Sequence, residues 1–136
     1  MLAQDDYELS RFCFTGLVPF STLVDILSLS DLHIYLTVPF VVSWSLINAM
    51  ACGRTVLASN TPPVREVITD GCNGLLADFF DVDGLAQLAV AVLRDPAAHR
   101  PLGDHAAEMV RERYALEVTL PKLVHWFERT LAGNLP

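Results

Sequence analysis

Short apolar runs alternate with segments of helical periodicity along most of this 136-residue chain. Runs that are apolar at almost every position are typical of strands buried on both faces of a parallel sheet. Four such runs occur, at residues 11–18, 31–36, 54–59 and 74–78. Their alternation with helical segments predicts an α/β fold, a Rossmann-like parallel sheet of about four strands with helices on both faces.

The predicted helices are bounded by residues that commonly begin or end helices. Asp81 and Ser43 are each suited to cap the start of a helix, and Asp95-Pro96 is suited to end one. Pro121 falls in the first turn of the last predicted helix, where proline is tolerated. The predicted helices cover residues 19–29, 43–52, 62–68, 81–94, 98–113 and 119–131.

The chain is long enough for one domain, with a core at residues 11–95 followed by C-terminal helices at 96–131. Hydrophobic residues make up 52% of it and charged residues 18%, below the usual share of about a quarter. Either these residues fill an α/β core, or some of them form a surface that packs against a partner. The last helix has an apolar stripe that suits a core or a docking surface, made of Leu120, Leu123, Val124, Phe127 and Leu131.

The net charge of −7 argues against a nucleic-acid-binding protein, which needs a basic face. The acidic N-terminus lacks the apolar core of a signal peptide, and residues 38–52 are too short and polar to span a bilayer. We therefore expect a cytoplasmic protein, either free or peripheral to a membrane. The three widely spaced cysteines predict free, buried thiols in a reducing compartment.

Residues 37–45 (TVPFVVSWS) indicate a possible anion site, because a buried strand is followed by a short loop and a helix that begins at a serine. The first-turn amides of Ser43, Trp44 and Ser45 would be unpaired donors at the positive end of the helix dipole, which suits a diphosphate. The alternative is a capped helix with no ligand.

The order of short motifs adds a family resemblance. Residues 45–63 (SLINAMACGRTVLASNTPP) are followed by Arg65-Glu66-Val67-Ile68 and by residues 71–76 (GCNGLL), and residues 15–19 (TGLVP) and 27–34 (LSLSDLHI) precede them. Over about residues 11–95 this succession resembles the C-terminal, donor-binding domain of glycosyltransferase family 4. That GT-B family has the hallmark Glu-x7-Glu-Ala-Met-Ala-x-Gly in this region.

The resemblance implies a retaining transferase that uses a nucleoside diphosphate sugar, linked to UDP, GDP or ADP, with no tightly bound cofactor. Val18 and Pro19 would lie along the base, and the amides of residues 43–45 would meet the phosphates. The acid that holds the ribose in the family corresponds here to Asn48, whose amide can still hydrogen-bond a hydroxyl. The acid that contacts the donor sugar corresponds to Phe40, which cannot replace it. As a lone phenylalanine in an apolar loop, Phe40 is expected to lie in the core. No catalytic residue is identified.

Two further polar groups are expected to be structural. Glu66 lies in the family's tail motif, but a solvated or structural role is favoured for it over a catalytic one. His33 lies within a predicted strand and is expected to be a core histidine with its hydrogen bonds satisfied. No carboxylate or histidine pair has metal-ligand spacing, so we expect no metal site.

A GT-B enzyme needs an N-terminal domain for its acceptor, so the resemblance implies a missing partner domain. In the strand order 3-2-1-4-5-6, the two strands that would separate residues 11–18 from residues 31–36 have no counterpart here. We expect these two segments to pair directly, or a partner chain to fill the gap and produce a homo-oligomer through exposed sheet edges.

Three functions remain open at this point. The first is the donor-nucleotide-binding part of a retaining glycosyltransferase that is inactive by itself. The second is a non-catalytic remnant of that domain that acts by self-association or partner binding. The third is a small response-regulator-like domain, which is disfavoured because Leu36 and Ser59 stand where an acidic cluster would be needed.

Overall fold

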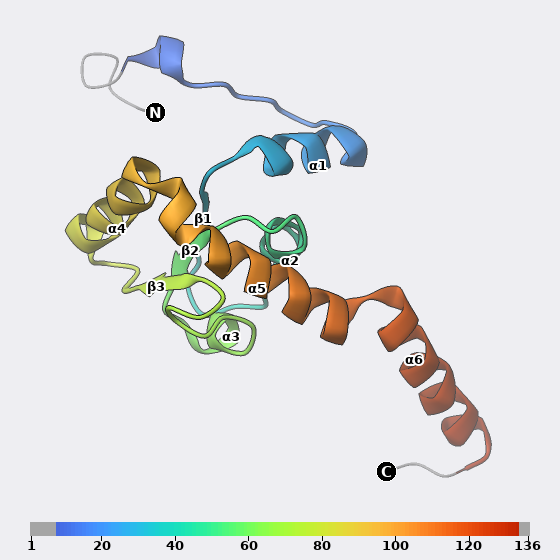
Figure 1. Ribbon diagram of the computed structural model, residues 1–136. Helices are drawn as coiled ribbons and strands as arrows, with labels where there is room; N and C mark the ends of the chain where they lie inside the picture. The colour runs from blue at the N-terminus through green and yellow to red at the C-terminus, as the bar shows by residue number, and fades with distance from the viewer. Residues whose placement is uncertain (1–7, 134–136) are drawn as a thin grey trace.

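A computed structural model describes residues 8–133, and a three-stranded parallel sheet lies at its centre (Figure 1). The strands are β1 (His33–Tyr35), β2 (Val56–Ser59) and β3 (Leu75–Ala77), in the order β1-β2-β3. His33 lies opposite Val56, and Leu57 lies opposite Leu75. Every residue of β2 is buried, as expected for the central strand. The predicted α/β fold with a parallel sheet is confirmed.

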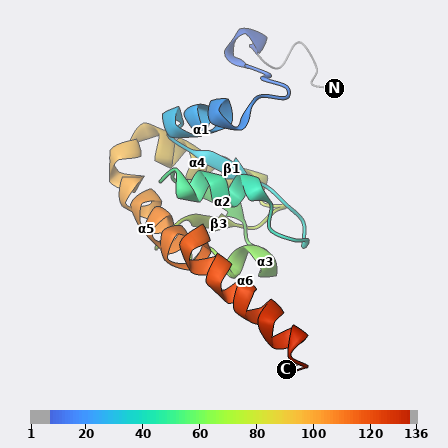
Figure 2. The same cartoon turned by 90° about the vertical axis from the view of Figure 1, so that its right-hand side faces the viewer.

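Helices pack on both faces of the sheet, and both α2 and α4 contact β2. Figure 2 shows α2 in front of the sheet and α4 behind it. The helices are η1 (Leu9–Arg11, a 3₁₀ turn), α1 (Phe20–Leu29), α2 (Trp44–Ala51), α3 (Pro62–Arg65), α4 (Val82–Arg94), α5 (Pro96–Tyr114) and α6 (Leu116–Leu131). No helix of the described residues is long and apolar enough to cross a membrane.

The strand predicted at residues 11–18 does not form, so the described sheet has three strands where about four were expected. This segment is an arm that leaves the body beyond α1, and no hydrogen bond joins residues 13–18 to other described residues (Figure 1). A β-prone segment needs a neighbouring strand for its backbone bonds, and Gly16, at φ 60°, interrupts the extended chain. The predicted direct pairing with β1 is therefore wrong.

The hydrophobic core is centred on α2. Leu46, Ala49 and Met50 of this helix are completely buried and belong to one cluster with β2 and with Ala106 of α5. This packing fixes α2 between the sheet and α5. The start of α2 is therefore held at the carboxyl edge of the sheet.

The C-terminal helices start earlier than predicted. α5 begins at Pro96, and the carboxylate of Asp95 accepts a hydrogen bond from the Ala98 amide at 3.1 Å. α6 begins at Leu116, so Pro121 lies beyond the first turn, inside the helix, and its predicted place in the first turn is wrong. α6 projects from the body (Figure 1), and none of its residues is buried. Its apolar stripe is therefore not part of this chain's core.

The three cysteines are free, as expected, but they are not all buried. Cys13 and Cys72 are exposed and Cys52 is half-buried. Cys13 lies on the exposed arm, and Cys72 is an exposed residue of the turn before β3. The prediction of buried thiols is therefore wrong for these two residues.

Candidate functional site

The candidate site lies at the carboxyl edge of the sheet, where the connections after β1 and β2 meet. The Thr37 amide donates a hydrogen bond to the Ser59 hydroxyl at 2.8 Å, which ties the loop after β1 to the end of β2. The Thr61 amide donates to the Ser59 carbonyl at 2.8 Å. These bonds hold the rim in one conformation, and ligands of parallel α/β sheets bind at this edge.

The start of α2 is only partly open. Ser43 occupies the N-cap position, but its hydroxyl interacts with the Ser45 hydroxyl at 2.8 Å instead of capping an amide. The Ser43 amide donates to the Tyr35 hydroxyl at 3.1 Å, so this amide is not free for a phosphate. Among the described residues, the amides of Trp44 and Ser45 have no partner outside the helix. Two of the three predicted donors thus remain open.

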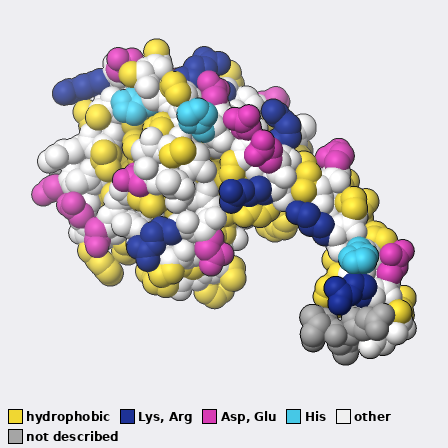
Figure 3. Space-filling view, turned by 60° about the horizontal axis from the view of Figure 1, so that its bottom comes forward, with side chains coloured by type: hydrophobic (Ala, Val, Ile, Leu, Met, Phe, Trp, Pro, Cys, Tyr) yellow, Lys and Arg dark blue, Asp and Glu magenta, His cyan; other side chains and the backbone are white. Residues whose placement is uncertain are grey.

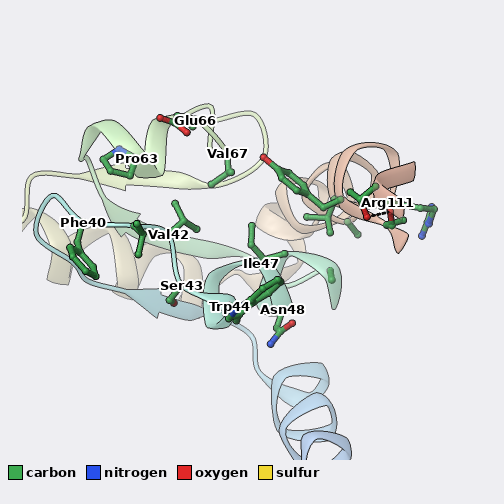
Figure 4. Close-up of a pocket in the computed structure, with 17 residues that line it drawn as sticks. Phe40, Val42, Ser43, Trp44, Ile47, Asn48, Pro63, Glu66, Val67 and Arg111 are labelled. Atoms are coloured by element: carbon green, nitrogen blue, oxygen red, sulfur yellow. Dashed lines mark hydrogen bonds between the residues drawn. The ribbon is translucent and has the colours of Figure 1, made fainter. Parts of the chain in front are cut away.

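A cavity of about 1020 Å³ lies beside the start of α2 (Figure 4). It is bounded by the loop after β1, by α2, by α3 and by the corner between α5 and α6. Ser43, Trp44 and Asn48 line it, and Ser45 does not. Its other lining residues are Phe40, Val41, Val42, Ile47, Ala51, Pro63, Glu66, Val67, Ala107, Val110, Arg111, Tyr114, Ala115 and Thr119. The walls are mostly apolar.

The two positions that correspond to family acids lie at this cavity. Asn48 makes no side-chain hydrogen bond within the described chain, and in Figure 4 its amide points away from α3, toward α1. Phe40 is 72% exposed, so it is not the core residue that an apolar loop would suggest. The amide of Asn48 is thus free to bind a ligand, whereas Phe40 presents a ring to solvent.

Val18 and Pro19 stand apart from the cavity. Pro19 is the N-cap of α1, and half-buried Val18 ends the exposed arm. Neither residue lines the cavity. The structure therefore groups Ser43, Trp44 and Asn48, and it does not bring the two predicted base-binding residues to the same cavity.

Two buried polar atoms are not explained by the sequence analysis. Among the described residues, His33 Nε2 and the Thr61 hydroxyl are buried without a hydrogen-bond partner. His33 is therefore not the satisfied histidine that was expected. Thr61 lies directly before α3, at the rim, and a threonine between an asparagine and a proline gave no sequence signal of burial. Burial lowers the pKa of His33 from its ordinary value of 6.5.

Acidic pH is expected to destabilise the protein through His33. Because its pKa is lower in the folded state, the unfolded chain binds the proton first, and the free energy of unfolding falls as the pH drops below about 6.5. Above that pH both states are neutral and the effect vanishes. Urea unfolding of the wild type and of His33→Leu, at a pH above and a pH below this value, measures the difference. If the wild type and His33→Leu lost the same free energy of unfolding at the lower pH, the predicted role of His33 would be contradicted.

Glu66 is exposed at the cavity mouth and makes no side-chain hydrogen bond within the described chain. Within residues 8–133, no group of three or more histidine, cysteine or carboxylate side chains could hold a metal ion. The cavity walls combine apolar side chains with the amide of Asn48, the carboxylate of Glu66 and the guanidinium of Arg111. A ligand could therefore be held there by apolar contacts, hydrogen bonds and charge.

Comparisons with known proteins agree with the observed fold and identify similar proteins. N-acetyl-alpha-D-glucosaminyl L-malate synthase of Bacillus anthracis is 32% identical over 106 residues, which cover 78% of this chain and 27% of that protein. Phosphatidyl-myo-inositol mannosyltransferase of Mycolicibacterium smegmatis is 33% identical over 88 residues, 65% of this chain and 22% of that protein. The chain thus spans less than a third of the length of these relatives.

Sucrose-phosphate synthase from Thermosynechococcus elongatus superposes with a TM-score of 0.81 at 26% identity, over 91% of this chain and 31% of that one. Its GT-B architecture confirms the resemblance in fold. Anabaena Alr3699/HepE, solved in complex with UDP, has the same fold, with a TM-score of 0.67 at 20% identity over 79% of this chain and 29% of that one. The family model for glycosyl transferases group 1 matches residues 2–95, and the chain belongs to that family.

Proposed function

We propose that this chain is the donor-nucleotide-binding part of a retaining glycosyltransferase that uses a nucleotide sugar linked to UDP, GDP or ADP. The observation that supports this best is the open start of α2, where the Trp44 and Ser45 amides have no partner outside the helix and lie at the carboxyl rim of the sheet. A helix start of this kind stabilises a diphosphate through its amides and its dipole. Membership of the glycosyl transferases group 1 supports the same proposal.

In this proposal, acceptor binding and catalysis belong to a different domain of the enzyme. The acceptor and the catalytic groups would be supplied by an N-terminal GT-B domain, because the cavity offers no carboxylate at either family position. Val18 and Pro19 would approach the base when that domain is present. We propose a cytoplasmic location, with peripheral attachment to a membrane as the alternative.

Removing the amide of Asn48 is expected to weaken nucleotide binding. A neutral hydrogen bond to a ribose hydroxyl contributes about 0.5–1.5 kcal/mol, so Asn48→Ala should raise the Kd of the preferred nucleotide about threefold to tenfold. Asn48→Glu should lower it, because a carboxylate forms a stronger, charge-assisted bond. Calorimetric titration with UDP, GDP and ADP measures both effects.

Gln87→Ala is the matched control, because it removes an exposed amide from α4, which does not line the cavity. This variant should bind as the wild type does. If none of the three nucleotides binds the wild type, the donor-site proposal is wrong for this chain.

A second candidate function is that of a non-catalytic module that binds a copy of itself or another protein. The free edge of β1 favours it, since no described strand pairs there and Ile34 is half exposed. An unpaired strand edge is a template for another strand. If the chain forms homo-oligomers through the β1 edge in the absence of nucleotide, this result would support the second function.

A further inference from the structure

Trp44 is a large aromatic side chain that is left open at the cavity. It is the first residue of α2 and lines the cavity, yet its side chain is 82% exposed. Within the described chain, its indole takes part in no ring contact and donates no hydrogen bond. An indole offers a flat apolar face that stacks on other flat rings. The Trp44 side chain is therefore available to a ligand.

Trp44 and Asn48 lie one turn apart on the same face of α2. Residues four apart in a helix have Cβ atoms about 5–6 Å apart, and both of these residues line the cavity. Figure 4 shows the indole beside the Asn48 side chain, whereas Phe40, in the loop before α2, lies well away from both. A ribose bound at Asn48 would therefore hold its base within reach of the indole.

The base of a nucleotide has no other partner assigned to it at this cavity. Val18 and Pro19, which the sequence placed along the base, do not line the cavity. An aromatic side chain can take this role, because bases stack on tryptophan, tyrosine and phenylalanine rings in many nucleotide-binding sites. Trp44 is such a side chain, and its own amide lies at the proposed diphosphate position.

Charge contributes little to the affinity of this site. Of the described residues that line the cavity, Arg111 alone is basic, and the carboxylate of Glu66 opposes it. Figure 3 shows lysine and arginine side chains scattered among acidic ones over the face that it draws, rather than gathered in a basic patch. Stacking does not depend on a charged partner, so it can supply affinity that the missing basic patch does not.

We propose that Trp44 is the base-contacting residue of this site, and that its indole stacks on the nucleobase while the α2 amides bind the diphosphate and Asn48 binds the ribose. The assignment rests on the proposed donor-nucleotide function and adds the side chain that contacts the base. Every nucleobase has a π-face, so the contact serves UDP, GDP and ADP alike. It requires no movement of Val18 or Pro19.

Substitutions of Trp44 test this contact by calorimetric titration of the 136-residue chain with UDP, GDP and ADP. Trp44→Ala should raise the Kd of the preferred nucleotide about fivefold to 150-fold, the range that base–aromatic stacking supplies. Trp44→Phe keeps a ring and should bind more nearly as the wild type does. Trp44→Leu keeps apolar bulk without a ring and should bind as weakly as Trp44→Ala. Circular dichroism checks that all three variants fold.

Two controls separate stacking from damage to the helix start. Trp126→Ala removes the other tryptophan, which is half-exposed on α6 and does not line the cavity, and it should bind as the wild type does. Inorganic pyrophosphate has no base and competes with the nucleotide for the α2 amides. Trp44→Ala should therefore leave the Kd of pyrophosphate unchanged while it weakens nucleotide binding.

Fluorescence gives an independent measurement of the contact. The chain contains two tryptophans, so Trp126→Phe leaves Trp44 as the single indole. The emission of this variant, corrected for absorption by the nucleotide, should fall as UDP, GDP or ADP saturates the site. Pyrophosphate, which cannot stack, should leave most of the emission in place.

The outcomes distinguish the base contact from the donor site itself. A nucleotide that binds the wild type and Trp44→Ala with equal Kd would overturn the stacking contact and leave the donor site standing. Equal losses of nucleotide and pyrophosphate affinity in Trp44→Ala, or wild-type affinity in Trp44→Leu, would also overturn it. If the wild type binds none of the three nucleotides, both the donor site and the base contact are wrong.

Discussion

Replacing Leu46 by alanine is expected to lower the free energy of unfolding by about 2–5 kcal/mol. Leu46 is completely buried in α2 and belongs to the core cluster that includes β2 and α5. The substitution removes apolar contacts and leaves a cavity that close-packed neighbours fill only in part. A domain of this size has a total stability of about 5–15 kcal/mol, so the loss is a large share of it. Urea unfolding measures it directly.

Trp44→Ala is the matched control, because it removes a larger side chain from the same helix. Trp44 is 82% exposed, so its loss should change the free energy of unfolding by no more than about 0.5 kcal/mol. Equal effects of the two substitutions would show that α2 does not pack on the sheet as described. The proposed phosphate site would then have no fixed position.

The fold was predictable from the sequence wherever local patterns and burial agree. The buried run at residues 54–59 became the central strand, and the Asp81 side chain caps α4 by accepting a hydrogen bond from the Gly84 amide at 2.9 Å. The strand follows from its apolar character, and the cap follows from residues that are close in the sequence. The family resemblance is confirmed by the family model over residues 2–95 and by the superposition on sucrose-phosphate synthase.

The prediction failed where an element depends on a distant partner. Residues 11–18 have the composition of a strand, but strand pairing is a tertiary interaction, and residues 13–18 make no hydrogen bond to β1 or to any other described residue. Pro121 was a misleading boundary signal, because α6 begins before it and continues through it. Periodicity identified the stripe of α6 but could not decide whether it lies in the core.

The site was predictable in its residue types more than in its geometry. The helix start at Ser43 was recognised, but the hydrogen bond from its amide to the Tyr35 hydroxyl was not, since it joins a strand side chain to a loop eight residues later. The exposure of Phe40 was also unexpected.

Replacing Gly103 by alanine is expected to destabilise the protein by about 1–3 kcal/mol, although alanine is the better helix former. Gly103 is buried in α5 where this helix crosses the turn after α2. A Cβ at this position would overlap the backbone carbonyl of Gly53 and approach the carbonyl carbon of Arg54 at 3.0 Å. Gly53 itself has φ 65°, so the turn has little freedom to move. The helices must therefore separate.

Asp104→Ala separates this steric cost from helix propensity, since Asp104 is the exposed neighbour in the same helix. It should stabilise the protein by a few tenths of a kcal/mol, whereas Gly103→Ala should lose stability despite a propensity gain of about 1 kcal/mol. Thermal and urea unfolding of both variants decide the sign. If Gly103→Ala were as stable as Asp104→Ala, α5 would not approach the turn after α2 this closely. The cavity lined by α2, α3 and α5 would then differ in shape from the one described.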